Sequence, residues 1–497
     1  MTKKIILSAL TTLTILFVSC NNIDLEVVNP PDPNTGVTLD NSINNFVWKG
    51  LNSWYNWQTN VPNLADIKDD NLDDYYTFLN GYSGPESLFG GLLYDVGNTD
   101  RFSWFIDDYV VQSQQFQGIS KSFGFRLQAV LINTNNDIIF YVRYVAPNSP
   151  ASNAGIKRGD IFNAIDGIIL NESNYDAVVS KLSNDSVTLS FVSENGGNLT
   201  FIQDKTITAI ELVEDPVYFK KVFNNINGKK VGYLVYNAFR SSYNDELNDA
   251  FAFLKAENID ELILDLRLNG GGSVLTSAYL ASMIYSNAGT DKFADLKFNF
   301  KHTNQNGAYD FENRLNVYNV NGIKTSEQTI NRLTKVTQLY VLTSSSTASA
   351  SEMIINGLKA FIPVKVIGTT TYGKNVGSIT LYDSPSSDYT NVASANSNHK
   401  NAMQPIVFQI FNKLGQSDYT QGFSPDIEIK EWIFWNNILP FGDENEVILK
   451  GALDDIRGVA SKSMSTAIYD NMKVFDVSQL EHKFEKEMYI DHEFFNN

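Results

Sequence analysis

The sequence predicts a multidomain α/β protein, in which a helical region and a small β domain precede a larger α/β domain. The chain of 497 residues is too long for one hydrophobic core, which suggests two to four domains. Aromatic residues at helical spacing occupy residues 41–115, alternating apolar runs occupy 116–212, and strands alternate with helices over 213–440. The content of 43% hydrophobic and 19% charged residues is ordinary for a globular protein.

The first nineteen residues resemble an export signal. Lys3 and Lys4 precede an apolar run, Ile5 to Val18, that is too short and too early to span a bilayer as a helix. The run is followed by Cys20, the single cysteine of the chain, so no internal disulfide can form. We therefore predict a lipoprotein signal peptide over 1–19.

The same stretch predicts acylation of Cys20. Small residues before a lone cysteine resemble a lipoprotein cleavage site, although Phe17 stands where leucine is more usual. A lipid on Cys20 would anchor the chain to a membrane, and the proline-rich residues 20–40 would form a tether. The alternative is a simple secretory signal with an incidental cysteine.

Residues 41–115 are predicted to form an N-terminal helical domain. Its aromatic residues, such as Phe46, Trp48 and Trp54, are expected in the core rather than in a ligand site.

Residues 116–212 are predicted to form a β domain. The runs 138–142 and 187–191 have strand patterns, and Asn148 to Asp160 combines a short helical stretch with a Gly-Asp turn. This stretch resembles the signature of PDZ domains in bacterial proteases. The resemblance implies that Phe123, Gly124 and Phe125 form the loop that receives a peptide's C-terminal carboxylate, while the adjacent strand edge pairs with the peptide. A structural β domain that binds nothing is the alternative.

Residues 213–440 are predicted to form an α/β domain with a largely parallel sheet. Strands are expected at 231–236, 262–266, 339–342 and 364–367, with helices at 245–255 and 274–285. Residues 441–497 are expected to form a short tail, mostly helical.

Three loops after strands of this domain carry the residues that could do chemistry. Ligands of such sheets bind at the carboxyl ends of the strands, so the loops are expected to face one crevice. The first, Asp265 to Gly272, ends in three glycines that let backbone N–H groups approach an anion. It lacks the spacing of a dinucleotide-binding fingerprint, and by itself it could be a plain turn.

The second loop, Ser344 to Glu352, is rich in serine and leads into an apolar helical pattern. Serine is common at helix starts as a cap, which is the simpler interpretation. A serine between a buried strand and a helix can also present its oxygen at the sheet edge, where the helix N-terminus stabilises developing negative charge.

The third loop, Gly368 to Asn375, nearly matches a phosphate-binding P-loop. Asn375 stands where that motif needs serine or threonine for magnesium, and a strand rather than a helix is expected to follow. Nucleotide binding is therefore excluded.

Together the three loops resemble the C-terminal processing peptidases (tail-specific proteases), a family of serine peptidases with a PDZ domain. The matching segments are Asp265-Leu266-Arg267 with Asn269 and Gly271-Gly272, then Ser349-Ala350-Ser351-Glu352, then Gly373-Lys374, and last Gly422 to Ile427. The resemblance covers residues 41–460 in the expected order. It implies a ClpP/crotonase-like fold for the peptidase domain.

The resemblance also implies roles for single residues. Ser349 takes the position of the nucleophile and Lys374 that of the general base, while the backbone N–H of Ala350 and one from Gly271 or Gly272 would hold the oxyanion. Many members carry glutamine four residues after the lysine, where this chain has Ser378, a possible third member of the site. Gly270 replaces a common proline, and Ala360 a functional aspartate of some members.

A lysine base must be neutral. Its ordinary pKa of about 10.4 would have to fall to about 7–8, which burial away from carboxylates can achieve. Lys374 is therefore predicted to be buried, unpaired and close to Ser349. None of the four histidines lies in a motif-like setting, and no metal or cofactor is expected.

The expected function is a serine endopeptidase of the cell envelope that acts on proteins or peptides through their C-terminal ends. The net charge of −18 argues against nucleic acid as a partner. An adaptor protein is possible, and the sequence leaves the oligomeric state open. The main alternative is a catalytically impaired, PDZ-bearing peptide-binding protein. An esterase with the same Ser–Lys pair and an envelope scaffold without chemistry are the others.

Overall fold

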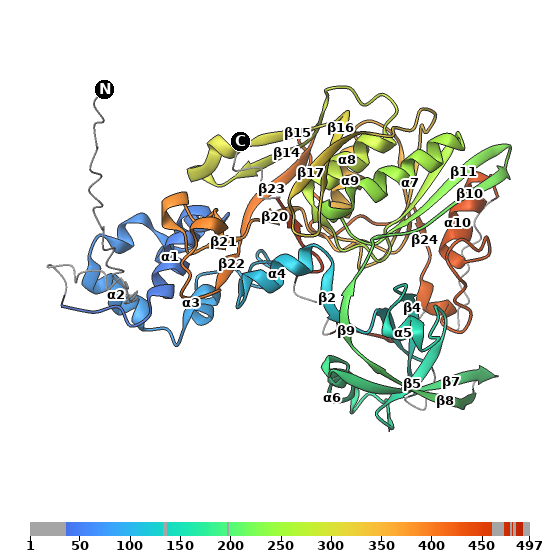
Figure 1. Ribbon diagram of the computed structural model, residues 1–497, viewed down its shortest axis with the longest axis horizontal. Helices are drawn as coiled ribbons and strands as arrows, with labels where there is room; N and C mark the ends of the chain where they lie inside the picture. Colours follow the sequence, from blue (N-terminus) through green and yellow to red (C-terminus); the bar gives the residue numbers. More distant parts are fainter. Residues whose placement is uncertain are drawn as a thin grey trace, which may run out of the picture.

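The computed structural model describes residues 36–132, 137–195, 198–459, 472–477, 480 and 484–490. The predicted signal peptide, Cys20 and all of the tether before residue 36 lie outside the described residues. Figure 1 shows the three parts that the sequence predicts, with the helical region (blue) to the left of the α/β body and the small β domain (teal and green) below it.

The N-terminal region is helical and packs on the α/β body. Its helices are α1 (Ser42–Trp54), α2 (Leu72–Asn80), α3 (Pro85–Gly91) and α4 (Tyr109–Phe116). Asn41 caps α1 by accepting a hydrogen bond from the N–H of Ile43. The aromatic side chains of α1, among them Phe46 and Trp48, are buried in the main core, as predicted. Strand β1 (Trp104–Ile106) attaches the region to β22 (Ala402–Gln404) of the body.

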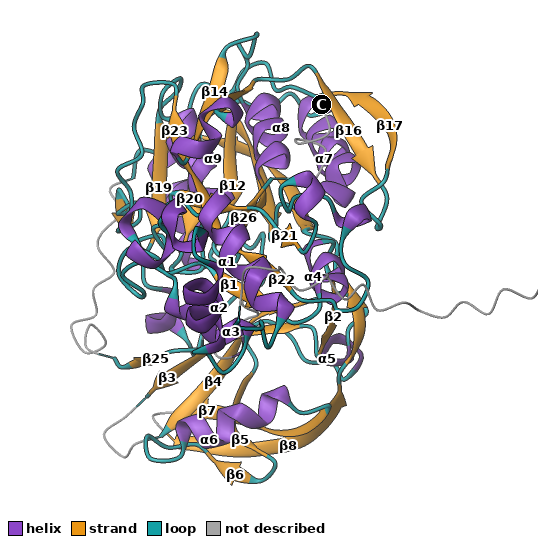
Figure 2. Cartoon of the chain, turned by 90° about the vertical axis from the view of Figure 1, so that its left-hand side faces the viewer, coloured by secondary structure: helices purple, strands orange, loops and turns teal. Residues whose placement is uncertain are grey.

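The β domain is an antiparallel sheet with short helices against it. Its strands are β3 (Phe125–Leu131), β4 (Ile138–Val145), β5 (Ile161–Ile165), β7 (Ser186–Asn195) and β8 (Asn198–Thr208), and its helices are α5 (Pro150–Asn153) and α6 (Tyr175–Val179). A ribbon of β2 (Ile119–Ser122) and β9 (Ile210–Val213) connects it to the body. Figure 2 shows it beneath the body.

The α/β body contains a sheet of six strands in the order β10-β11-β12-β18-β19-β24, parallel apart from β10. These strands are β10 (Val217–Ile226), β11 (Lys229–Tyr236), β12 (Glu261–Asp265), β18 (Leu339–Thr343), β19 (Val364–Gly368) and β24 (Ile427–Glu428). Helices α7 (Asn244–Ala256), α8 (Val274–Ile284) and α9 (Ala350–Leu358) share a core with one face, and α10 (Val447–Ile456) with the other.

A second sheet of the body has the order β13-β26-β20-β23-β14-β15. It consists of β13 (Gly272–Ser273), β26 (Met488–Tyr489), β20 (Val376–Ser378), β23 (Ile406–Asn412), β14 (Lys292–Phe298) and β15 (Gly307–Asp310). The hairpin of β16 (Arg314–Tyr318) and β17 (Lys324–Thr329) lies outside both sheets.

The predicted helical tail includes α10, and most of the residues after 459 lie outside the described part of the chain. The described residues after 459 include two short strands, β25 (Val474–Phe475) on the β domain and β26 in the second sheet of the body. Strands so short have no periodicity that a sequence could reveal. Strand β25 adds to the outer strand β3, whereas β26 lies between β13 and β20 and pairs with both. Within the described residues, no helix has the length and apolarity needed to cross a membrane.

Candidate active site

Ser349 occupies a strained turn between β18 and α9. Its backbone has φ 64° and ψ −117°, a combination that L-residues rarely adopt. Strand β18 is fully buried and delivers the chain to this turn at the carboxyl edge of the sheet. A serine on a sharp strand-to-helix turn is also the arrangement of the nucleophile in α/β-hydrolases.

The hydroxyl of Ser349 is buried and has no hydrogen-bond partner among the described residues. The neighbouring glycine loop closes over it. A Cβ placed on Gly271 would lie 2.7 Å from Ser349 Cβ and 3.0 Å from the nitrogen of Ala350. Only a glycine fits at this approach, so the first and second predicted loops do meet at Ser349.

Glu352 connects the serine turn to the lysine loop. Its carboxylate accepts hydrogen bonds from the backbone N–H groups of Ser349 (2.9 Å), Gly373 (2.7 Å) and Lys374 (2.8 Å), and from the hydroxyl of Thr371 (2.6 Å). Burial raises the pKa of Glu352, although these donors act in the opposite direction. The arrangement fixes the backbones of Ser349 and Lys374 on one buried side chain.

Lys374 is fully buried, as predicted, but it is not unpaired. Its Nζ lies 3.1 Å from Oε2 of Glu487, and 4.8 Å from the centre of the Phe102 ring. Burial lowers the pKa of Lys374, and the carboxylate of Glu487 opposes that shift. No hydrogen bond joins Nζ to Ser349 Oγ within the described residues, and apo sites often tighten such contacts only with substrate.

Among the described residues, Ser378 is connected to Lys374 through Glu487. The Ser378 hydroxyl donates to Oε2 of Glu487 (2.7 Å) and accepts from Nε2 of Gln404 (2.9 Å). Gln404 is fully buried, comes from β22, and also accepts from Gln112 and Thr380. A glutamine side chain therefore lies beside Ser378. It comes from β22, whereas the resemblance expects a glutamine at position 378 itself, on β20.

The two glycines predicted as oxyanion donors differ in what they bind. The N–H of Gly271 donates to Oδ1 of Asn269 (2.9 Å) within its own loop. The N–H of Gly272 donates to the backbone carbonyl of Glu487 (2.7 Å). A carbonyl oxygen therefore already lies against this loop, close to the point where Gly271 approaches Ser349 and Ala350.

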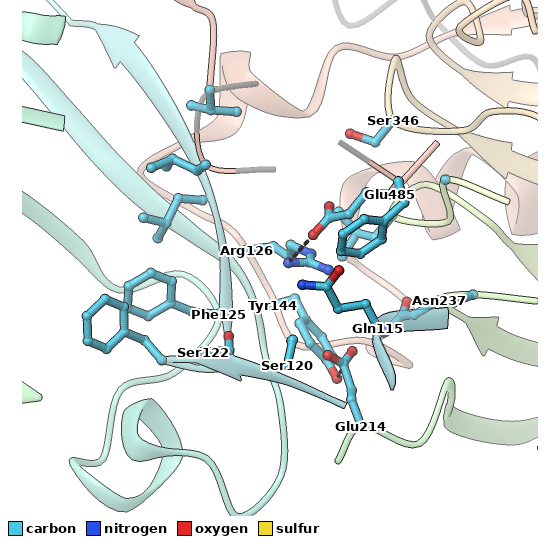
Figure 3. Close-up of a pocket in the computed structure, with 18 of the residues that line it drawn as sticks. Gln115, Ser120, Ser122, Phe125, Arg126, Tyr144, Glu214, Asn237, Ser346 and Glu485 are labelled. Carbon is cyan, nitrogen blue, oxygen red and sulfur yellow. Dashed lines mark hydrogen bonds and ion pairs between the residues drawn. The ribbon is translucent and has the colours of Figure 1, made fainter. Parts of the chain in front are cut away.

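The predicted carboxylate loop lies at one end of a cavity of about 550 Å³ between the β domain and the body. Phe123 and Phe125 line it, with ring centres 5.8 Å apart, and Gly124 packs against Ser149 behind them. The opposite wall contains Gly270, Gly271 and Gly272. Figure 3 shows Phe125 and Arg126 on the β-domain side, and the ion pair of Arg126 with Glu485 (3.2 Å) across the cavity.

Three sequence profiles match the chain in the order of its structural parts. "Peptidase S41 N-terminal domain" matches residues 42–104, "PDZ domain" matches 141–192, and "Peptidase family S41" matches 230–429. The chain belongs to peptidase family S41. This confirms the predicted resemblance and the predicted fold class, with its helical, PDZ and α/β peptidase parts.

Relatives of this S41 chain carry consistent names. It is 24% identical over 270 residues to the carboxyl-terminal-processing protease of Picosynechococcus sp., covering 54% of this chain and 59% of that protein. It is 23% identical over 326 residues to a CtpA-like serine protease of Staphylococcus aureus, covering 64% and 57%. The chain thus spans just under three fifths of the length of these curated relatives.

A solved structure of an S41 protease from Bacteroides fragilis shares the fold of this S41 chain. It has a TM-score of 0.64 and 25% sequence identity, and the match covers 85% of this chain and 99% of the other.

Sequence reasoning missed four polar groups of the site in this S41 chain. Glu352 stands within the quoted nucleophile motif, three residues after Ser349, and that spacing was a usable signal for its contact with the Ser349 N–H. Glu487, Gln404 and Trp104, whose indole N–H donates to Glu487 (3.1 Å), come from distant segments and had no local signal.

Proposed function

We propose that this chain is a serine endopeptidase of the C-terminal processing type, with Ser349 as nucleophile and Lys374 as general base. The observation that carries the proposal is the buried hydroxyl of Ser349 on a strained turn, which has no hydrogen-bond partner among the described residues. Glu352 accepts from the backbone N–H groups of both Ser349 and the buried Lys374. Strain of this kind persists where surrounding structure enforces it, and it is concentrated at active sites.

The reaction would proceed through an acyl-enzyme. Neutral Lys374 removes the proton of Ser349 Oγ as the oxygen attacks a peptide carbonyl. The N–H of Ala350 and one from the Gly271–Gly272 loop stabilise the oxyanion. The lysine then gives its proton to the departing amine. Water, activated by the same lysine, hydrolyses the ester and restores the Ser349 hydroxyl.

Substrates would be proteins or peptides recognised through their C-terminal ends. The PDZ part supports this, because its loop at Phe123–Phe125 and the glycine loop line one cavity. We also propose that a lipid on Cys20 anchors the enzyme in the cell envelope, facing the periplasm or the surface. An adaptor protein and an oligomeric assembly are compatible with this function.

The test is cleavage of a loosely folded protein by the chain from Asn21 onward, followed by mass spectrometry. We expect cleavage by the parent and by Ser345→Ala, which changes an exposed serine of the same run, and none by Ser349→Ala or Lys374→Ala. Cleavage that survives Ser349→Ala would exclude this nucleophile.

The second candidate is a PDZ-bearing peptide-binding protein with impaired catalysis. The observation that favours it is the ion pair of Lys374 with Glu487, since a charged lysine cannot accept a proton. Peptide binding with a micromolar affinity, together with no cleavage by any variant, would support this candidate over the peptidase.

A further inference from the structure

The described residues of the 472–490 stretch, here called the 472–490 segment, first add a strand to the PDZ sheet. Strand β25 pairs antiparallel with β3, with Val474 opposite Val130 and Phe475 opposite Ala129. The N–H of Leu131 donates to the carbonyl of Lys473 (2.9 Å). Figure 2 shows β25 beside β3, the strand that follows the predicted carboxylate loop. Adding a strand to a sheet edge in this way is how PDZ domains bind peptides.

The side chains of the segment enter the groove between β3 and α6. The ring of Phe475 lies 4.7 Å from that of Tyr175 on α6, and the Tyr175 hydroxyl donates to the carbonyl of Asp476 (2.9 Å). Val477 and Leu480 pack on the core of the β domain. Residue numbers rise along the segment as they fall along β3, so the segment runs toward the loop at Phe123–Phe125.

The described residues 484–490 of the segment lie beside the glycine loop. Glu485 pairs with Arg126, and β26 pairs in parallel with β13, placing Met488 opposite Gly272. The carbonyl of Glu487 accepts from the N–H of Gly272, and its carboxylate pairs with Lys374. A Cβ on Gly271 would lie 2.7 Å from that carbonyl oxygen and also 2.7 Å from Ser349 Cβ, so carbonyl and nucleophile flank one glycine.

We infer that the described residues of the 472–490 segment form a built-in pseudosubstrate, which occupies the edge of β3 and the glycine loop beside Ser349 until a peptide displaces it. This rests on the proposed function. The segment makes a substrate's contacts with the strand edge and the glycine loop. In addition, the carboxylate of its Glu487 forms an ion pair with Lys374, the proposed base. Productive substrates therefore share the aromatic and apolar residues that contact α6 and β3, and lack a carboxylate at the place of Glu487.

Because the 472–490 segment is part of the same chain, it competes strongly with a free peptide. A segment joined to the chain acts at an effective concentration in the millimolar range, so a free peptide of weaker affinity cannot open the groove. A substrate must bind both the PDZ groove and the crevice, which favours proteins with long extended tails over short peptides.

The test locks the segment in place and measures peptide binding instead of cleavage. Cysteines are introduced at Val130 and Val474 in the full chain carrying Cys20→Ser and Ser349→Ala. Opposite residues of an antiparallel pair lie about 4.5–5.5 Å apart, within disulfide range. The probe is a fluorescent peptide with the sequence of residues 472–490, followed by anisotropy before and after reduction.

We expect the disulfide to form on oxidation and the oxidised protein to bind the probe at least about tenfold more weakly than the reduced protein. The matched control is Thr188→Cys with Thr206→Cys, an opposite pair of β7 and β8 in which Thr188 is half-buried and Thr206 exposed, and whose disulfide should leave binding unchanged. Failure of the Val130–Val474 disulfide while the control forms, or equal binding in both redox states, would overturn the inference.

A second variant covers the case in which the cysteine pair prevents folding. Phe475→Ala removes the ring that contacts Tyr175 and should increase the affinity for the probe by about tenfold, because the competitor is weakened. Unchanged affinity would contradict the inference. Since Ser349 is absent in every arm, failure of the proposed peptidase activity has no effect on these readouts.

Discussion

Two buried cations of this protein have opposite surroundings. Arg267 is fully buried, and its guanidinium forms hydrogen bonds to Asp265 (2.8–3.0 Å), Glu446 (2.7 and 3.0 Å) and Glu431 (3.1 Å). Burial works against its charge, yet the carboxylates of Asp265 and Glu446 raise the pKa of Arg267 well above its ordinary value. Lys374 is buried just as fully, its Nζ forms an ion pair with Glu487, and burial lowers its pKa.

The two surroundings fit two roles: Arg267 stabilises the fold, and Lys374 serves the proposed chemistry. The Arg267 cluster also includes Arg143 and Arg158 of the β domain, which pair with Glu431, so it fixes the β domain to the body. Each charged side chain of this cluster pairs with a residue of the folded domains. The partner of Lys374 sits on the 472–490 segment, and its departure would leave an uncompensated buried amine that favours the neutral form.

Replacing the lysine should abolish chemistry with little effect on folding. For Lys374→Met, we expect cleavage of a peptide substrate to fall by about 10³-fold or more, because Lys374 is the proposed base of Ser349. Its unfolding free energy should fall by only about 1–2 kcal/mol, because Glu487, the carboxylate that loses its cation, keeps hydrogen bonds from Ser378 and Trp104. Single-turnover cleavage and urea denaturation measure the two effects. A strongly destabilised Lys374→Met would remove the contrast with Arg267.

Replacing Arg267 should instead have its main effect on the unfolding free energy. Arg267→Met leaves Asp265, Glu431 and Glu446 buried without their central cation, which should cost about 3–5 kcal/mol of unfolding free energy. The control is Arg314→Met, which breaks an exposed pair with Glu327 and should cost about 1 kcal/mol or less. Urea denaturation followed by circular dichroism is the measurement. Equal effects of the two variants would refute a scaffold role for Arg267.

Replacing Glu352 should lower activity because its carboxylate positions the backbones of Ser349 and Lys374. Glu352→Gln places an amide where the backbone N–H groups of Ser349, Gly373 and Lys374 need an acceptor, so kcat should fall by about 100-fold with KM little changed. Steady-state kinetics on a peptide substrate would separate the two constants. A rise in KM alone would place Glu352 in substrate binding instead.

Glu487 should set the pH dependence. Activity needs neutral Lys374 and therefore rises as pH passes its pKa. Burial lowers that pKa and the Glu487 carboxylate opposes it, so Glu487→Gln should lower the pKa further and move the acidic limb of the kcat/KM profile to lower pH. A shift toward higher pH would contradict the assigned ion pair.

Ser378 should matter least. Its hydroxyl bonds to Glu487 and Gln404 rather than to Lys374, so Ser378→Ala should change kcat/KM by less than about threefold. Its comparison with Glu487→Gln under the same conditions shows whether the network acts through the carboxylate. A loss of 100-fold would make Ser378 a member of the catalytic group.

Local sequence patterns predicted most of the fold and about half of the residues of the candidate site. The strands at 231–236 and 339–342 and the helix at 274–285 have the predicted places, because their apolar patterns follow from burial on known faces. The glycine loop and the serine turn meet because parallel strands end at one edge. Glu487 pairs with a residue more than a hundred positions away, and no local pattern encodes such a contact.

The backbone of Ser349 has one consequence for choosing an inactive variant. Its φ and ψ are the mirror image of an ordinary extended conformation, which glycine adopts freely and alanine does not. Ser349→Ala deletes the hydroxyl and keeps the strain, whereas Ser349→Gly deletes both. The glycine variant should therefore melt at a higher temperature than the parent, which makes it the better trap for capturing enzyme–substrate complexes.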